Sequence, residues 1–108
     1  MIAFTALADP KRRRIVELLA TGEMAAGDIG KHFRVSSPAI SQHLKVLRDA
    51  HLVRVRIDAQ RRVYSLDPKG LDELEEWVMS IRKFWNHKLD ALERVLRDSP
   101  PESRRKKS

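Results

Sequence analysis

The sequence predicts a mainly α-helical protein with a small β-hairpin, in the order helix, helix, helix, helix, strand, strand, helix. Three observations support this prediction. Asp-Pro or Ser-Pro pairs, which are typical of a first helical turn, precede three segments whose apolar residues recur every three or four positions. Between the last two of these segments, apolar and basic residues alternate with the period of a β-strand. A length of 108 residues, with 42% apolar and 34% charged residues, is typical of one small globular domain.

Four helices are expected in the first 50 residues. Residues 2–7 form a short apolar helix, and Asp9 caps a second helix that stops at a Thr-Gly pair. Residues 26–33 form a weaker helix, because the glycines within it disfavour helical structure. Ser37 caps a fourth helix, which runs to about Ala50 and carries one apolar stripe. The third and fourth helices are therefore separated by a short turn.

The hairpin and the last helix complete the predicted fold. Residues 53–57 alternate between apolar and basic side chains, residues 58–61 form a turn, and residues 62–66 return as the second strand. An Asp-Pro pair then opens the last helix, which covers about residues 69–96 and carries a broad apolar stripe. Residues 97–108 are polar and basic, and we expect them to form a flexible tail.

The charge of the chain indicates a polyanion or an acidic surface as its partner. The sequence holds 22 lysine and arginine residues against 15 aspartate and glutamate residues, a net charge of +7. Residues 1–66 hold 12 basic and 6 acidic residues, whereas residues 67–96 hold 5 basic and 7 acidic residues. The basic surface is therefore expected on the first four helices and the hairpin, not on the last helix.

Several classes of function are excluded or disfavoured by composition. The chain contains no cysteine, which excludes disulfides, thiolate metal sites and cysteine nucleophiles. The first residues, MIAFTALADP, hold no apolar leader segment, and no stretch reaches the roughly 20 apolar residues that a membrane span needs. We therefore expect a cytoplasmic protein with no membrane partner. His43 lies near Ser41, but residues two apart do not face each other on a helix and no acid orients the ring, so no catalytic site is predicted.

The predicted element order over residues 1–96 is that of a winged helix-turn-helix, which binds double-stranded DNA. In this fold the second helix of the pair enters the major groove and the hairpin lies along the backbone. The amide of Gln42 matches an adenine edge, and Lys45 can reach guanine or a phosphate. The predicted recognition residues are Ser36, Ser37, Ala39, Ser41, Gln42 and Lys45. The predicted contacts of the wing and of the second helix with the DNA backbone are Arg54, Arg56, Arg61, Arg62 and Arg13.

Three runs of residues resemble a known family, namely FTALADPKRRRIVELL, SSPAISQHLKVLRDAHLV and RRVYSLDP. They resemble the ArsR-type bacterial transcriptional regulators over about residues 4–96. The resemblance implies a homodimeric winged-helix repressor that binds an inverted-repeat operator. It also implies that the first and last helices form the dimer interface. The regulated genes, the operator sequence and any small-molecule effector do not follow from it.

The metal sites of that family have no counterpart in this sequence. Metal-sensing members carry a two-cysteine motif in the helix before the recognition helix, and Ala25 and Gly27 stand in those places here. A second family site uses aspartate and histidine residues of the last helix, where this chain has His87 without a second histidine at ligand spacing. The chain therefore resembles the branch of the family that lacks both metal sites, and we predict neither a metal nor a cofactor.

The apolar stripe of the last helix is predicted to form the seam of a homodimer. This stripe is longer than a small helical head can cover, and a nearly neutral or acidic segment does not repel its own symmetric copy. The alternatives are an ordinary core and an apolar effector pocket between subunits. The predicted interface residues are Ile2, Phe4, Leu7, Leu74, Val78, Ile81, Trp85, Leu89 and Leu92.

Two other functions fit the same fold. One is a non-specific architectural DNA-binding protein, whose affinity follows charge rather than sequence. The other is a winged-helix module that binds proteins. The polar face of the predicted recognition helix and the basic hairpin favour a sequence-specific DNA-binding regulator over both alternatives.

Overall fold

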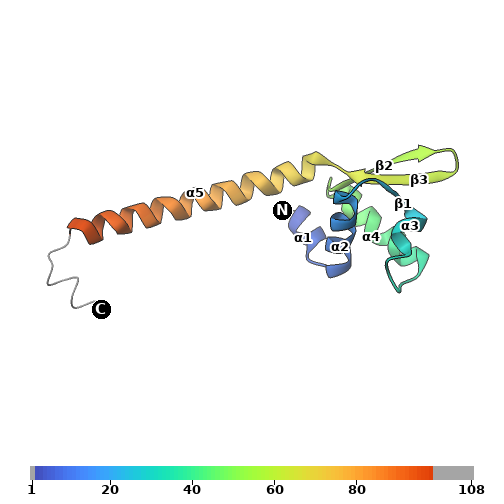
Figure 1. Ribbon diagram of the computed structural model, residues 1–108, viewed down its shortest axis with the longest axis horizontal. Coiled ribbons are helices and arrows are strands. Elements are labelled where there is room, and N and C mark those ends of the chain that lie inside the picture. The colour runs from blue at the N-terminus through green and yellow to red at the C-terminus, as the bar shows by residue number, and fades with distance from the viewer. Residues whose placement is uncertain (1, 99–108) are drawn as a thin grey trace. The chain divides into compact units, whose positions relative to one another are not determined.

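The computed structural model describes residues 2–98 and confirms the mainly helical fold with a β-hairpin (Figure 1). The elements are α1 (Ile2–Leu7), α2 (Pro10–Ala20), β1 (Met24–Ala25), α3 (Ala26–Gly30), α4 (Ser37–Asp49), β2 (Val53–Asp58), β3 (Arg61–Leu66) and α5 (Pro68–Asp98). The chain divides into two compact units within α5, after Glu75. We call residues 2–75 the N-terminal unit and residues 76–98 the C-terminal unit, and we describe each by itself. No helix in the described range is long and apolar enough to span a membrane.

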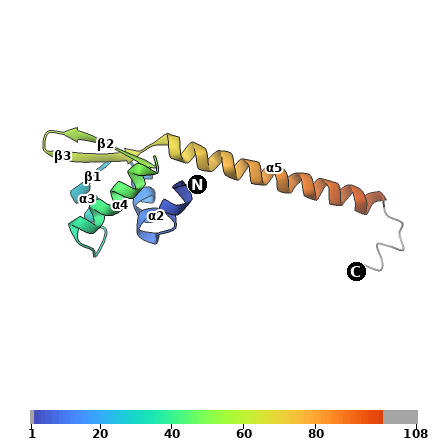
Figure 2. The same cartoon turned by 180° about the vertical axis from the view of Figure 1, so that it is seen from behind.

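The sheet of the N-terminal unit contains a strand that the sequence did not predict. Among the described residues, antiparallel strands lie in the order β1-β3-β2, and β1 pairs with β3 through Met24 opposite Tyr64. A strand of two residues is too short to produce a period-2 pattern, so it could not be predicted from the sequence. Figures 1 and 2 show β2 and β3 as a ribbon on one side of α2, α3 and α4.

Several predicted boundaries were wrong. The third helix ends at Gly30 rather than near residue 33, because the following residues make tighter turns, with the amide of Phe33 donating to the carbonyl of Gly30. The second strand of the hairpin begins at Arg61, so the turn is shorter than predicted. The helix α5 continues to Asp98, which makes the first two residues of the predicted tail helical. Residues 99–108 of that tail lie outside the described residues.

The core of the N-terminal unit lies among its helices and the sheet. The helix α4 contributes Ile40, Leu44 and Leu47, which are at most 3% exposed. Burying a side chain of this size stabilises the fold by about 1.5–3 kcal/mol. The remaining large and fully buried side chains of the core are Ile15, Ile29, Leu52 and Val53. The first turns of α5 also belong to this unit, since Leu71 and Leu74 pack partly against the core.

A backbone hydrogen bond connects the residue after α4 to the first turn of α5. His51 follows α4 with a φ of 57°, and its carbonyl accepts a hydrogen bond of 2.8 Å from the amide of Gly70. A Cβ atom on Gly70 would clash with that same carbonyl oxygen. Only glycine therefore allows the two backbones to approach so closely.

This contact predicts that Gly70→Ala destabilises the protein by about 1–3 kcal/mol, the usual cost of forcing an extra methyl group into a packed site. Urea unfolding followed by circular dichroism measures the change. Gly27→Ala is the matched control, since a Cβ there meets nothing within 4 Å and alanine favours a helix by about 1 kcal/mol. Equal stabilities of the two variants would contradict the close approach at Gly70.

Candidate nucleic-acid interface

The helix α4 separates its side chains into a buried stripe and an exposed polar face. Opposite the buried stripe, Ser37, Ser41, Gln42 and Lys45 are exposed, and Ala39 at the edge of this face is half-buried. The hydrophobic stripe holds the helix against the core, so the polar face is directed away from it. The structure thus brings the predicted recognition residues together on one surface.

The first turn of α4 is capped by a different serine from the one predicted. The Oγ atom of Ser36 accepts a hydrogen bond of 3.3 Å from the amide of Ala39, and Ser36 has extended backbone angles, so it is the N-cap. Ser37 is the first helical residue. The Pro38 that follows was correctly taken as a helix start, but the cap lies one residue earlier. The Oγ atom of Ser36 accepts the capping hydrogen bond, and its O–H can still donate to another group.

The predicted wing arginines divide into two groups. Arg56 donates to Glu23 at 2.6 Å and lies 3.6 Å from a carboxylate oxygen of Asp58, and Arg61 lies 3.4 Å from Asp28. The hydrogen bond that Arg56 donates to Glu23, followed by the attraction of that carboxylate's charge, raises the pKa of Arg56 above its ordinary value.

The second group consists of Arg54 and Arg62. Within residues 2–98, neither side chain takes part in an ion pair, and both are exposed. Cross-strand pairing places Arg54 opposite Ser65 and Arg62 opposite Ile57, where no acid neutralises them. These two side chains therefore retain the uncompensated positive charge of the hairpin.

The arginines near the start of α2 contact the chain itself. Arg13 donates to the carbonyl of Leu7 at 2.9 Å and to the carbonyl of Ala8 at 3.3 Å, which satisfies groups at the end of α1. Arg12 donates to the carbonyl of Ala6 at 2.5 Å. The sequence showed these residues only as a charge run, so their capping role was missed. Contact of Arg13 with DNA stays a prediction.

One exposed cation beside the recognition face was missed by sequence reasoning. Arg34 lies in the connection between α3 and α4, and among the described residues it takes part in no ion pair. Its position in the turn of the helix pair is the signal that could have identified it, since phosphate contacts in this fold are made near the ends of the helices. Arg34 extends the basic surface next to Ser37.

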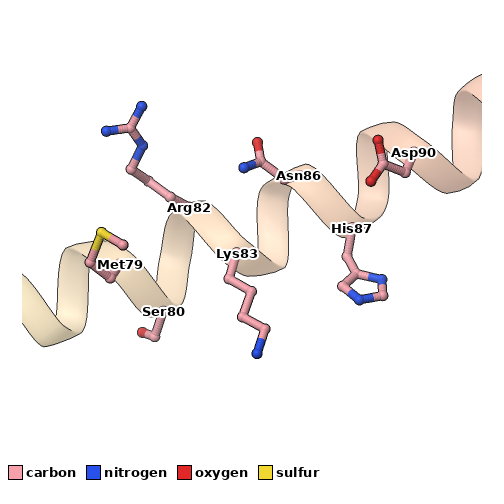
Figure 3. A pocket seen from close by; sticks show the side chains of 7 residues that line it. All are labelled: Met79, Ser80, Arg82, Lys83, Asn86, His87 and Asp90. Atoms are coloured by element: carbon pink, nitrogen blue, oxygen red, sulfur yellow. The ribbon is translucent and has the colours of Figure 1, made fainter.

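The pockets described within residues 2–98 are open to solvent. One, of about 620 Å³, is lined by side chains of α5 alone, and Figure 3 shows them projecting from successive turns of this helix. A groove of about 260 Å³ lies between α3 and α4, beside Ser37 and Ser41. In residues 2–98 no group of three histidine, aspartate or glutamate side chains is placed to hold a metal ion.

The predicted dimer residues are placed in two different environments. Leu7 and Leu74 are half-buried and pack against the core of the N-terminal unit. The others are exposed: Ile2 by 69%, Phe4 by 40%, Val78 by 44%, Ile81 by 47%, Trp85 by 60%, Leu89 by 44% and Leu92 by 54%. Exposed apolar side chains of this number on one helix are unusual for a monomer and indicate a contact surface.

A helix pair with an exposed polar second helix, followed by a basic hairpin, defines a winged helix-turn-helix protein. Residues 9–55 match the family model described as bacterial regulatory protein, arsR family. The HTH-type transcriptional regulator Rv2034 of Mycobacterium tuberculosis is 49% identical over 87 residues, which are 81% of this chain and 78% of that protein. The transcriptional repressor SdpR of Bacillus subtilis is 40% identical over 77 residues, covering 71% of this chain and 86% of that one.

A solved structure supports the same conclusion. The crystal structure of a possible transcriptional regulator for arsenical resistance superposes with a TM-score of 0.70 at 41% identity, covering 93% of this chain and 98% of the other. The chain belongs to the arsR family of bacterial regulatory proteins. It is a transcriptional regulator and not an enzyme.

The cap of α2 carries a pH-dependent contribution to stability. Partial burial alone would raise the pKa of Asp9, but hydrogen bonds from the amides of Lys11 and Arg12, with the nearby His43 and Arg12 side chains, lower it below its ordinary value. Because the folded pKa is the lower one, the carboxylate stabilises the fold above its unfolded pKa. This contribution is lost as the pH falls through the folded pKa.

We therefore expect the stability difference between the wild type and Asp9→Asn to shrink as the pH is lowered from about 7 to about 3. Asparagine also caps a helix but does not titrate, so it isolates the charge. Urea unfolding at a series of pH values measures the difference. A difference that stays constant over this range would contradict the lowered pKa.

Proposed function

We propose that this protein is a homodimeric repressor that binds an inverted-repeat operator in double-stranded DNA. The observation that carries the proposal is the exposed polar face of α4, which a buried apolar stripe directs away from the core. The helix α4 enters the major groove and the β2–β3 hairpin follows the backbone. This proposal assigns base reading and backbone binding to different elements.

Base reading is assigned to the middle of α4. The amide of Gln42 offers one donor and one acceptor, which match N7 and N6 of adenine. Lys45, about one turn further along, donates to guanine or to a phosphate. Ser37 and Ser41 lie nearer the helix N-terminus, where hydroxyl and amide groups favour a phosphate.

Backbone binding is assigned first to the cations without an acidic neighbour. Arg54 and Arg62 are exposed and, within the described part of the chain, unpaired, so binding a phosphate requires no ion pair to break. The positive charges of Arg56 and Arg61 are partly neutralised by their ion pairs with Glu23 and Asp28. The charge distribution therefore supports unequal contributions from the four wing arginines.

The exposed apolar surface of the C-terminal unit supports dimerisation. A second copy that covers Val78, Ile81 and Leu92 would remove their apolar surface from water, which stabilises the pair by about 25 cal/mol per Å². The exposed Ile2 and Phe4 of α1 offer additional apolar contacts. Two recognition helices held by one dimer bind half-sites about 34–36 Å apart, so the second half-site is bound at high effective concentration.

The operator can be identified by selecting bound duplexes from a random-sequence library. The proposal expects a two-fold symmetric consensus whose half-sites are separated by about one helical turn, roughly 10–10.5 base pairs. Bound DNA without a consensus would instead support the architectural protein. A failure to enrich any DNA would support the protein-binding module.

On the selected operator, Gln42→Ala is expected to weaken binding by about 1–3 kcal/mol, because a base contact is lost while phosphate contacts remain. Binding to random DNA is expected to change little. Fluorescence anisotropy with both duplexes measures the two affinities. Asn86→Ala, an amide change of the same kind in the C-terminal unit, is the control. Equal losses on operator and random DNA would remove Gln42 from the base-reading role.

The wing gives a second prediction. Arg62→Ala is expected to weaken binding to operator and random DNA alike and to reduce the slope of log affinity against log salt by about 0.9, the value for one phosphate contact. Arg56→Ala removes the same charge, but that charge is already paired with Glu23, so a smaller change of slope is expected. Titrations at several salt concentrations measure both slopes. Identical changes would show that pairing with Glu23 does not decide which arginine binds.

A further inference from the structure

The two acids that pair with arginines of the hairpin from outside it, Glu23 and Asp28, come from one short segment of the chain. Glu23 directly precedes β1, and Asp28 lies in the first turn of α3, which follows β1 without a gap. Figure 1 shows β1 beside β3 and leading into α3. The pairing of β1 with β3 therefore holds residues 23–28, and with them both carboxylates, beside the hairpin.

The arginines that these acids meet lie on one face of the sheet. Arg56 of β2 and Ala25 of β1 are paired with the same residue of β3, so their side chains point to the same face. Arg61 lies two residues before that residue of β3 and shares this face. Arg56 reaches Glu23 at 2.6 Å, and Arg61 reaches Asp28 at 3.4 Å. The four charged side chains are 48% to 63% exposed, so a DNA phosphate can compete for both arginines.

We propose that Glu23 and Asp28 are specificity determinants that weaken binding of the hairpin to DNA other than the operator. Each carboxylate occupies an arginine that a phosphate would otherwise bind, and it places a negative charge where that phosphate must approach. The inference rests on the DNA binding of the proposed function, and it gives a role to two acids that the proposed function does not use. Repulsion of a competing ligand is a common source of specificity.

The loss of phosphate contacts affects random DNA more than the operator. Binding to random DNA depends on phosphate contacts alone, whereas binding to an operator also uses base contacts. On the operator, base contacts of α4 fix the position of the hairpin, and its phosphate contacts come from Arg54 and Arg62, which the described residues leave unpaired. On random DNA no base contact fixes the protein, so it takes the position that brings the most free cations to phosphates. Arginines that are already paired cannot add to that number.

Two further charges lie beside these ion pairs and determine which pair gives the clearer test. Asp58, at the end of β2, lies 3.6 Å from Arg56, so removing the charge of Glu23 frees this arginine only in part. Lys31 lies 3.4 Å from Asp28, so removing the charge of Asp28 releases a lysine as well as an arginine. The pair of Glu23 with Arg56 therefore gives the clearer test, because a change there releases one cation.

Glu23→Gln removes the charge and keeps an oxygen that accepts a hydrogen bond. On a random duplex in about 0.1 M salt, its affinity is expected to rise by up to about eightfold, and the slope of log affinity against log salt to steepen by up to about 0.9, the values for one phosphate contact. The rise on the selected operator is expected to be smaller. Fluorescence anisotropy at several salt concentrations measures both duplexes. Asp49→Asn is the matched control, since Asp49 is exposed at the end of α4 and forms no ion pair within residues 2–98.

The same substitution in an Arg56→Ala background separates the ion pair from a general change of charge. The rise on random DNA is expected to fall by about half or more there, because the arginine that Glu23 occupies is absent. Urea unfolding establishes that each variant is folded, and Asp28→Asn replaces Glu23→Gln if the latter does not fold.

The outcomes separate this inference from the proposed function. The inference would be overturned by an equal rise in both backgrounds, by an equal rise on operator and random DNA, or by a rise no larger than that of Asp49→Asn. A wild type that selects no operator would overturn the proposed function itself. An operator-selecting wild type, together with a rise that is confined to random DNA and depends on Arg56, supports both.

Discussion

The burial of the apolar stripe of α4 is the constraint on which the rest of the structure depends. Ile40, Leu44 and Leu47 are almost inaccessible, and they join the core to which the sheet and the other helices of the N-terminal unit contribute. Because a helix has a fixed angular period, burying one stripe also determines which residues face outward. The polar face with Gln42 and Lys45 is thus positioned by hydrophobic packing behind it. The hydrogen bond from the amide of Gly70 to the carbonyl of His51 then connects the end of this helix to α5.

Electrostatic pairing divides the basic residues into structural and available cations. Some acidic residues of the N-terminal unit lie beside particular arginines, as Glu23 does with Arg56 and Asp28 with Arg61. Surface pairs of this kind add little stability, typically below about 1 kcal/mol. Their larger effect is on the surface potential, since they leave Arg54 and Arg62 as the uncompensated charges of the hairpin. The net charge of the chain therefore overstates the number of cations ready to bind a phosphate.

The apolar residues are divided in a comparable way between the core and the exposed helix. Leu71 and Leu74 pack against the N-terminal unit, whereas Val78 and the apolar residues that follow it on α5 remain exposed. The apolar stripe of α5, which is continuous in the sequence, is therefore divided between the core of the N-terminal unit and an exposed surface. The polar residues around His87 line an open pocket that is formed by side chains of α5 alone.

The sequence by itself determined the helices with strong caps, the alternating hairpin and the polar face of α4, because these depend on local periodicity and on residues such as Asp9 and Pro10. Only the tertiary structure decided that β1 joins the sheet, that Ser36 rather than Ser37 caps α4, and that Arg13 binds the carbonyls at the end of α1. It also decided which wing arginines are paired. These features depend on which side chains and strands meet in the folded chain or on exact backbone angles, and neither leaves a periodic signal in the sequence.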